Sequence, residues 1–211
     1  KKTAQILNDG RIAAIKGIGG FHLAVDAKNE NAVKLLRRRK HRDHKPFAMM
    51  TGDIETIRKY AKIDKTAERI LTSPESPIVL LEKIQDGELA PSAAPGVNTF
   101  GFMLCYSPLH HLLFAETGIE VLVMTSANHS DEPLICGNDE ALSKIGDIAD
   151  VFLMHNREIF RQVDDSVVQV VAGEQAMLRR SRGYVPQPIL SETPVKKQIF
   201  AACYPAFSKE M

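Results

Sequence analysis

Residues 34–45, KLLRRRKHRDHK, hold seven lysines or arginines and are followed by Pro46. Such cations suit a polyphosphate, because an arginine can bind two oxygens at once while a lysine acts as a point charge. They also suit a nucleic-acid backbone. Past the predicted helix end, an extended chain would project Lys40 and Arg42 to one side. A solvated helix end explains the cluster as well as a phosphate site does, and this segment alone leaves these interpretations open.

A second stretch, VLVMTSANHSDEP at residues 121–133, runs from an apolar strand into small polar residues. Loops at the carboxyl ends of strands hold ligands in open α/β folds. Ser126 and Asn128 in this loop are candidate donors to phosphate or ribose oxygens. In isolation, however, a Ser/Asn turn more often satisfies its own backbone.

Two further stretches carry weaker signals. In KGIGGFHLAVDA, residues 16–27, glycines would let backbone N–H groups approach an anion, but the GxGxxG dinucleotide pattern is incomplete. Near the C-terminus, 164–166 (DDS) begins one predicted strand and Arg179-Arg180 ends the next. A hairpin would bring these groups to one end of a sheet, as an ion pair, a wall of a nucleotide pocket or a divalent-ion site. The spacing does not choose among the three.

Composition limits the class of protein. The 27 Lys and Arg residues nearly balance the 26 Asp and Glu residues, so bulk charge does not favour nucleic-acid binding. The chain also has only four Tyr and no Trp on which bases could stack. Three cysteines without CxxC spacing argue against a zinc site. Because no run of 18 apolar residues and no signal-peptide core occurs, we expect a cytoplasmic protein without a membrane partner.

The elements that must position these residues alternate between helix and strand. Asn29 is a predicted N-cap, and two closely spaced strands near the C-terminus predict a hairpin and therefore a mixed sheet. We expect one domain over residues 1–190 and a C-terminal tail, 191–211, that either starts a missing domain or is a truncated end. Helices are predicted at about 3–8, 30–40, 53–61, 65–72, 107–116 and 138–146, and strands at about 11–16, 46–50, 76–82, 99–104, 119–126, 149–155, 165–172 and 176–181.

Taken in order, several long stretches resemble the YrdC-like domain of HypF-type hydrogenase maturation carbamoyltransferases, over about residues 3–189. The resemblance implies an α/β fold: a single YrdC-like domain with an open, twisted, mixed parallel and antiparallel sheet, flanking helices and a basic concave cleft. The wider YrdC/TsaC superfamily shares the sparser KxR and SxN elements, here 40–42 and 126–128. The stretches are AIKGIGGFHLAVDA, LLRRRKHRDHKPFAMM, SPESPIVLLEK, SPLHHLLF, MTSAN, DDSVVQV and LRRSRGYVPQPI.

The resemblance implies an ATP-dependent adenylation. In such proteins a carbamate attacks the α-phosphate of ATP, pyrophosphate leaves and carbamoyl-adenylate forms, as part of carbamoyl transfer in NiFe-hydrogenase maturation. Lys40 and Arg42 are the implied catalytic residues, with Mg²⁺ completing charge neutralisation and no metal ligand assigned to the protein. By the same resemblance, 37–39 (RRR) mostly form the helix end and face solvent. The implied ATP-binding residues are Lys40, Arg42, Lys45, Ser126, Asn128 and Arg179.

Lys16, Gly17 and Ser166 are the implied substrate-pocket residues. Where relatives that modify tRNA resemble Pro-Thr-x-Thr, this chain has Lys-Gly-Ile-Gly at 16–19, which favours a bare carbamate over threonylcarbamate. The alternatives are a threonylcarbamoyl-adenylate synthase and a double-stranded RNA or tRNA-binding module. In a full-length protein, the implied partners are a substrate derived from carbamoyl phosphate, acylphosphatase-like, zinc-binding and carbamoyl-transfer domains, and the acceptor protein HypE.

Overall fold

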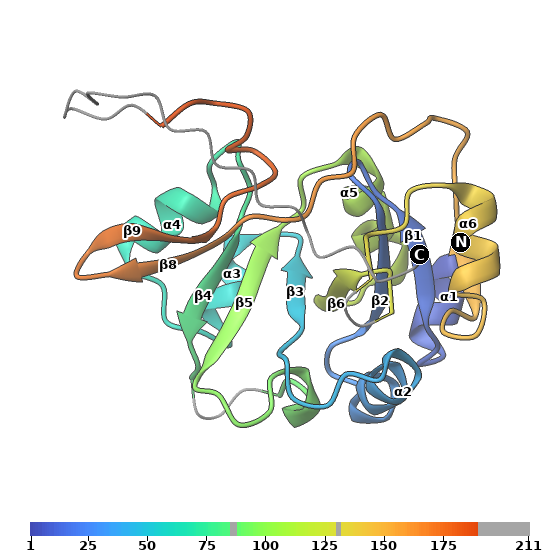
Figure 1. Ribbon diagram of the computed structural model, residues 1–211. Helices are drawn as coiled ribbons and strands as arrows, with labels where there is room; N and C mark the ends of the chain where they lie inside the picture. The colour runs from blue at the N-terminus through green and yellow to red at the C-terminus, as the bar shows by residue number, and fades with distance from the viewer. Residues whose placement is uncertain (85–87, 130–131, 190–211) are drawn as a thin grey trace.

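The computed structural model describes residues 1–84, 88–129 and 132–189. The tail predicted at 191–211 lies outside these residues. The described strands form one mixed sheet in the order β7-β1-β2-β6-β3-β5-β4-β8-β9 (Figure 1). The strands are β1 (Ala13–Lys16), β2 (Phe21–Asp26), β3 (Ala48–Thr51), β4 (Ile78–Glu82), β5 (Thr99–Leu104), β6 (Val121–Ser126), β7 (Val151–Leu153), β8 (Val167–Val171) and β9 (Glu174–Arg179).

The helices begin where the sequence supplies side-chain caps. Asn29, Asp53, Asp64 and Ser107 each accept a hydrogen bond from the backbone N–H three residues later, which satisfies a donor that the first helical turn leaves unpaired. The predicted alternation of helices and strands and the predicted mixed sheet are both confirmed. The helices are α1 (Lys2–Asn8), α2 (Glu30–Lys40), α3 (Ile54–Arg58), α4 (Lys65–Leu71), α5 (Pro108–Thr117) and α6 (Asn138–Lys144), with a 3-10 turn at Pro91–Ala93.

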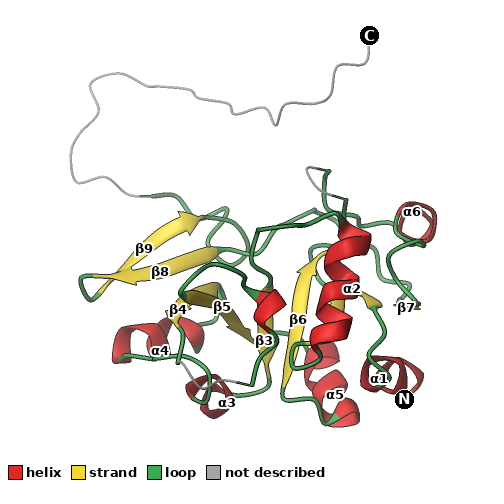
Figure 2. Cartoon of the chain, turned by 90° about the horizontal axis from the view of Figure 1, so that it is seen from below, coloured by secondary structure: helices red, strands yellow, loops and turns green. Residues whose placement is uncertain are grey.

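The two faces of the sheet are covered unequally. Buried residues of α2, α3, α4 and α6 belong to one large apolar cluster, whereas α1 and α5 contribute Leu7 and Leu113 to a smaller cluster on the opposite face. Figure 2 shows α3 and α4 toward the end of the sheet that holds β8 and β9, and α1 and α6 toward the end that holds β7. No helix in the described part of the chain is both long and apolar enough to cross a bilayer.

Strand pairing brings the candidate residues to a common region. The pairing of β2 with β6 puts His22 opposite Ser126. The predicted C-terminal hairpin is confirmed as β8–β9, in which Val167 lies opposite Arg179. The sequence analysis did not predict β2, because a fully buried strand directly after a glycine-rich loop shows no polar and apolar alternation.

One prediction for the basic cluster is wrong. Arg37 does not face solvent: it is 9% exposed, and its guanidinium donates to the backbone carbonyls of Arg42 at 2.8 Å and Ala93 at 3.3 Å, and also to that of Ser92. Arg39 pairs with Asp150 at 3.1 Å. Of the three arginines, the one that stays exposed is Arg38. Arginine is suited to this interior role because its fork of donors satisfies several carbonyls that a folded loop leaves unpaired.

Candidate functional site

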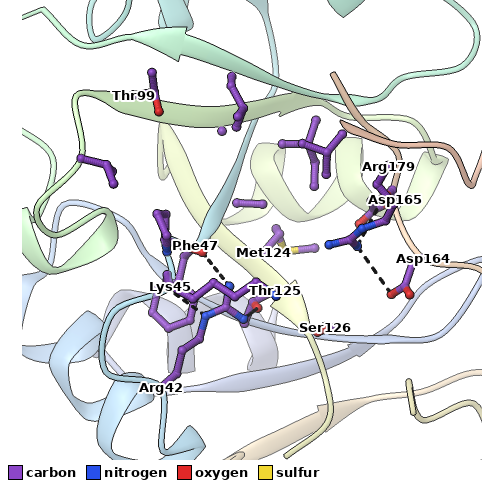
Figure 3. Close-up of a pocket in the computed structure, with 17 residues that line it drawn as sticks. Arg42, Lys45, Phe47, Thr99, Met124, Thr125, Ser126, Asp164, Asp165 and Arg179 are labelled. Atoms are coloured by element: carbon purple, nitrogen blue, oxygen red, sulfur yellow. Dashed lines mark hydrogen bonds and ion pairs between the residues drawn. The ribbon is translucent and has the colours of Figure 1, made fainter. Parts of the chain in front are cut away.

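A cavity of about 380 Å³ opens on the same sheet face as the smaller apolar cluster (Figure 3). Its walls come from the loop before β3, from β4, β5 and β6, and from the β8–β9 hairpin. Arg42, Lys45 and Phe47 gather at one side, and Arg179, Asp164 and Asp165 at the other, with Met124 to Ser126 of β6 between them. The remaining lining residues are Pro46, Ala48, Ile78, Leu80, Val97, Thr99, Gly101 and Val167.

Arg42 reaches the cavity through a helix cap. The prediction of an extended chain at Lys40 and Arg42 is wrong, because Lys40 ends α2 and His41 takes the left-handed conformation with φ of 49°. The N–H of His41 then donates to the Arg38 carbonyl and the N–H of Arg42 to the Arg37 carbonyl. This C-terminal cap turns the chain sharply, so Lys40 and Arg42 point to different surroundings.

The guanidinium of Arg42 is fixed before any ligand arrives. It donates to the Pro46 carbonyl at 2.6 Å and the Lys45 carbonyl at 3.1 Å, and it lies 5.0 Å from the centre of the Phe47 ring. Burial, together with the charges of Arg37 and Arg179, lowers the pKa of Arg42 to about 10. Guanidiniums that repel each other across a cavity favour an anion between them.

Lys40 does not line this cavity. Its side chain is 2% exposed, and its ammonium donates to the Ser126 carbonyl at 2.8 Å, to the Asn128 side-chain oxygen at 2.8 Å and to the Asn128 carbonyl. Burial, together with the charges of Arg42 and Lys45, lowers the pKa of Lys40 to about 7. Lys40 therefore holds the loop after β6, one layer behind the cavity wall.

The SxN loop is held as a unit. Ser126 lines the cavity, and its hydroxyl donates to the Asn128 side-chain oxygen at 2.8 Å. The Asn128 amide in turn donates to the Glu132 carbonyl at 2.5 Å, and Asn128 is not among the lining residues. The structure thus brings Arg42, Lys45, Ser126 and Arg179 to the cavity and places Lys40 and Asn128 behind it.

The three predicted substrate-pocket residues lie elsewhere. Ser166 is fully buried and bridges two backbone segments, donating to the Arg182 carbonyl at 2.9 Å and accepting from the Ser181 N–H at 2.7 Å. Lys16 and Gly17 line a different cavity. Sequence position alone gave no indication of this separation, because it depends on where the distant strands β1 and β8 lie in the sheet.

The acidic side of the cavity rests on a buried charge network that the sequence analysis missed. Asp165 accepts from Arg182 Nε at 2.9 Å and from His22 Nε2 at 3.3 Å. Burial by itself raises the pKa of Asp165, but the hydrogen bond and charge of His22 and the charge of Arg182 outweigh it and hold the pKa well below its usual range. Residues 143 positions apart supply this pair, so no local pattern reveals it.

Asp164 is the carboxylate of the cavity that is more open to ligands. It is half exposed, and its nearest cation is Arg179 at 4.0 Å. Among the described residues, no cluster of three or more His, Cys, Asp or Glu side chains is arranged to hold a metal ion. Magnesium that arrives on a polyphosphate needs only one or two protein carboxylates, so Asp164 fits that mode and a dedicated metal cage does not.

Comparison with known proteins identifies the family. Residues 5–181 match the Sua5/YciO/YrdC family model, described as telomere recombination. Carbamoyltransferase HypF of Rhizobium leguminosarum bv. viciae is 46% identical over 195 residues, covering 90% of this chain and 26% of the relative. That of Rhodobacter capsulatus is 49% identical over 184 residues, covering 87% and 24%. The chain therefore spans about a quarter of the length of these curated relatives.

Solved structures agree with the sequence comparisons. Full-length HypF in the phosphate- and nucleotide-bound form superposes with a TM-score of 0.88 at 50% identity, covering 92% of this chain and 31% of that chain. Sua5 of P. abyssi complexed with L-threonine gives 0.75 at 19% identity, covering 85% and 53%, which supports the shared fold alone. From the family match, the relatives and the superposed fold together, the chain is a member of the Sua5/YciO/YrdC family.

Proposed function

We propose that this domain binds ATP in the 380 Å³ cavity and forms carbamoyl-adenylate as one step of carbamoyl transfer in hydrogenase maturation. The support from comparison is that relatives named carbamoyltransferase HypF match nearly the whole chain and that a HypF structure at 50% identity is nucleotide-bound. Because those proteins are about four times longer, the role of this segment in the whole reaction is part of the proposal.

The observation that carries the proposal is that the cavity wall combines cationic side chains with an apolar surface. Arg42, Lys45 and Arg179 supply three cations, while the strands contribute an apolar floor that includes Ile78 and Leu80. A nucleotide offers matching surfaces, because it combines anionic phosphates with a flat, largely apolar base. The cavity volume also lies in the range of small-molecule sites, roughly 300–1,000 Å³.

The chemistry needs positioning and charge neutralisation rather than a protein nucleophile. A carbamate oxygen forms a bond to the α-phosphorus, the bond from that phosphorus to the oxygen bridging to the β-phosphate breaks, and pyrophosphate leaves with the electron pair. Arg42 and Arg179 are placed to bind phosphate oxygens, with Lys45 as a further point charge. Magnesium, when bound with the nucleotide beside Asp164, would supply further neutralisation of the leaving pyrophosphate.

The proposed substrate and partners rest on the resemblance to HypF-type proteins. The acyl donor is proposed to be carbamate derived from carbamoyl phosphate, and the product to pass to a carbamoyl-transfer domain and then to the acceptor protein HypE. Acylphosphatase-like and zinc-binding domains would complete the full-length context.

ATP–pyrophosphate exchange tests the function directly. Labelled pyrophosphate should enter ATP when the domain is supplied with ammonium bicarbonate, which equilibrates with carbamate, and threonine should add nothing. Exchange that depends on threonine would instead assign threonylcarbamoyl-adenylate synthesis. Failure to bind any nucleotide, together with tRNA affinity that falls steeply with salt, would replace the enzyme with an RNA-binding module.

A further inference from the structure

A second cavity of about 510 Å³ is lined by the β1–β2 turn, the start of α5 and the segment after β7. It shares no lining residue with the first cavity. His22 lies near both, because its Nε2 contacts Asp165 of the first cavity while a Cβ placed on Gly17 of the second would lie 3.1 Å from its Nδ1. The polar and basic residues of the second wall are Lys16, Ser107, His155, Arg157 and Arg161, with Glu158 as the acidic one.

Lys16 at this cavity is a buried cation, and none of the described carboxylates forms an ion pair with it. Its side chain is 4% exposed, and its ammonium donates to the backbone carbonyl of His155 at 3.2 Å. Within the described residues, no carboxylate lies within salt-bridge distance of it. Burying an ammonium that keeps one carbonyl acceptor is costly, and an anion entering the cavity would remove that cost.

Other groups at the cavity make it attractive to an anion. Ser107 and Pro108 belong to the N-terminal end of α5, a ten-residue helix whose dipole places partial positive charge there. Arg157 and Arg161 are exposed at the rim. In addition, Nδ1 of His155 is buried and has no hydrogen-bond partner among the described residues. Such a group normally finds a partner in a water or ligand.

We propose that the second cavity is an oxyanion site, separate from the nucleotide cavity, for a small anion of the phosphate or carbonate class. Lys16 provides the buried charge, and Arg157 and Arg161 provide the field that draws the anion in. Two or three charge-assisted hydrogen bonds suit a compact oxyanion, since each such bond is strong in a site that excludes water. The nucleotide cavity plays no part in this binding.

Isothermal titration with sodium phosphate and, separately, with sodium bicarbonate tests this site. Wild type should bind at least one of the two anions, and Lys16→Met should weaken that binding at least tenfold. Arg38→Ala, an exposed variant that lines neither cavity, should leave it unchanged. Preference between the two probes distinguishes a tetrahedral phosphate from a planar carbonate as the natural anion.

A second variant keeps the test valid if Lys16→Met fails to fold. The double variant Arg157→Ala, Arg161→Ala changes exposed side chains alone and should weaken the same binding several-fold, with a thermal midpoint equal to that of wild type. Absence of binding by wild type, or binding that survives Lys16→Met in a folded protein, overturns the proposal. ATP titration of the same variants shows independently whether the first cavity binds nucleotide, so the two proposals can fail separately.

Discussion

The ammonium of Lys40 donates to the side-chain oxygen of Asn128 at 2.8 Å, which joins the end of α2 to the loop after β6. The same oxygen accepts from the Ser126 hydroxyl at 2.8 Å. The KxR motif at 40–42 and the SxN motif at 126–128 therefore form one structural unit, although Lys40 and Ser126 are 86 positions apart in the sequence. Within this unit Arg42 and Ser126 face the cavity, while Lys40 and Asn128 fix their positions.

Replacement of Arg42 should weaken nucleotide binding without unfolding the protein. Arg42→Ala removes a guanidinium already held by backbone carbonyls and ready to bind phosphate, so we expect ATP affinity to fall by about 10- to 100-fold, the worth of one or two charge-assisted hydrogen bonds. Titration calorimetry measures the loss. Arg38→Ala, an exposed neighbour on α2, is the matched control and should bind as wild type. Retained ATP affinity in Arg42→Ala would exclude the phosphate role.

Nucleotide binding should be linked to proton uptake at Lys40. Because the free protein holds the pKa of Lys40 at about 7, much of its amine is neutral at pH 8. A bound polyphosphate favours the charged form and raises that pKa, so affinity should fall as pH increases from 7.5 to 9. Calorimetry at pH 8 in two buffers of different ionisation enthalpy measures the proton taken up.

The control for this linkage is Lys40→Met, which removes the titrating group. Its ATP affinity should be nearly independent of pH between 7.5 and 9, and its heats should no longer depend on the buffer. An unchanged pH profile in Lys40→Met would assign the proton to another group.

Arg37 should contribute strongly to stability. Arg37→Met leaves carbonyls that include those of Ser92 and Ala93 unpaired in a buried loop, at a cost on the order of 3 kcal/mol in the free energy of unfolding. Urea denaturation monitored by circular dichroism measures the change. Arg38→Met, one residue along the same helix, should stay within about 0.5 kcal/mol of wild type. Equal effects from the two variants would contradict the buried role of Arg37.

The Asp165 network should give the protein acid-sensitive stability. The folded pKa of Asp165 lies below its unfolded value, so its contribution is complete above about pH 4 and is lost as pH falls further. Asp165→Asn leaves Arg182 without its buried partner and should cost about 3–5 kcal/mol at pH 7. Urea denaturation at pH 7, 5 and 3 should show the difference between wild type and variant shrinking at the lowest pH.

Asp164→Asn provides the comparison for this experiment. Asp164 is exposed and 4.0 Å from Arg179, so its change should cost less than about 1 kcal/mol at any of these pH values. If Asp164→Asn and Asp165→Asn behaved alike, the buried network would not be the source of the pH dependence.

Local signals in the sequence determined most of the elements. Asn29 and Ser107 are capping residues followed by helical patterns, so the starts of α2 and α5 could be predicted from neighbouring residues. The apolar runs at 78–82, 99–104 and 121–126 are equally local signals of buried strands. The family resemblance, carried by long motifs, likewise needed no coordinates and is confirmed by the match over residues 5–181.

Tertiary structure decided what each polar residue of those motifs does. The left-handed turn at His41 sends Lys40 into the interior and Arg42 to the cavity, although both belong to one three-residue motif. Lys16 and Arg42 are both cations close to strand ends, yet they line separate cavities. Sequence patterns report the residue types and the local backbone. Which carbonyl or carboxylate a long side chain meets depends on contacts between distant segments, and the folded chain alone brings those together.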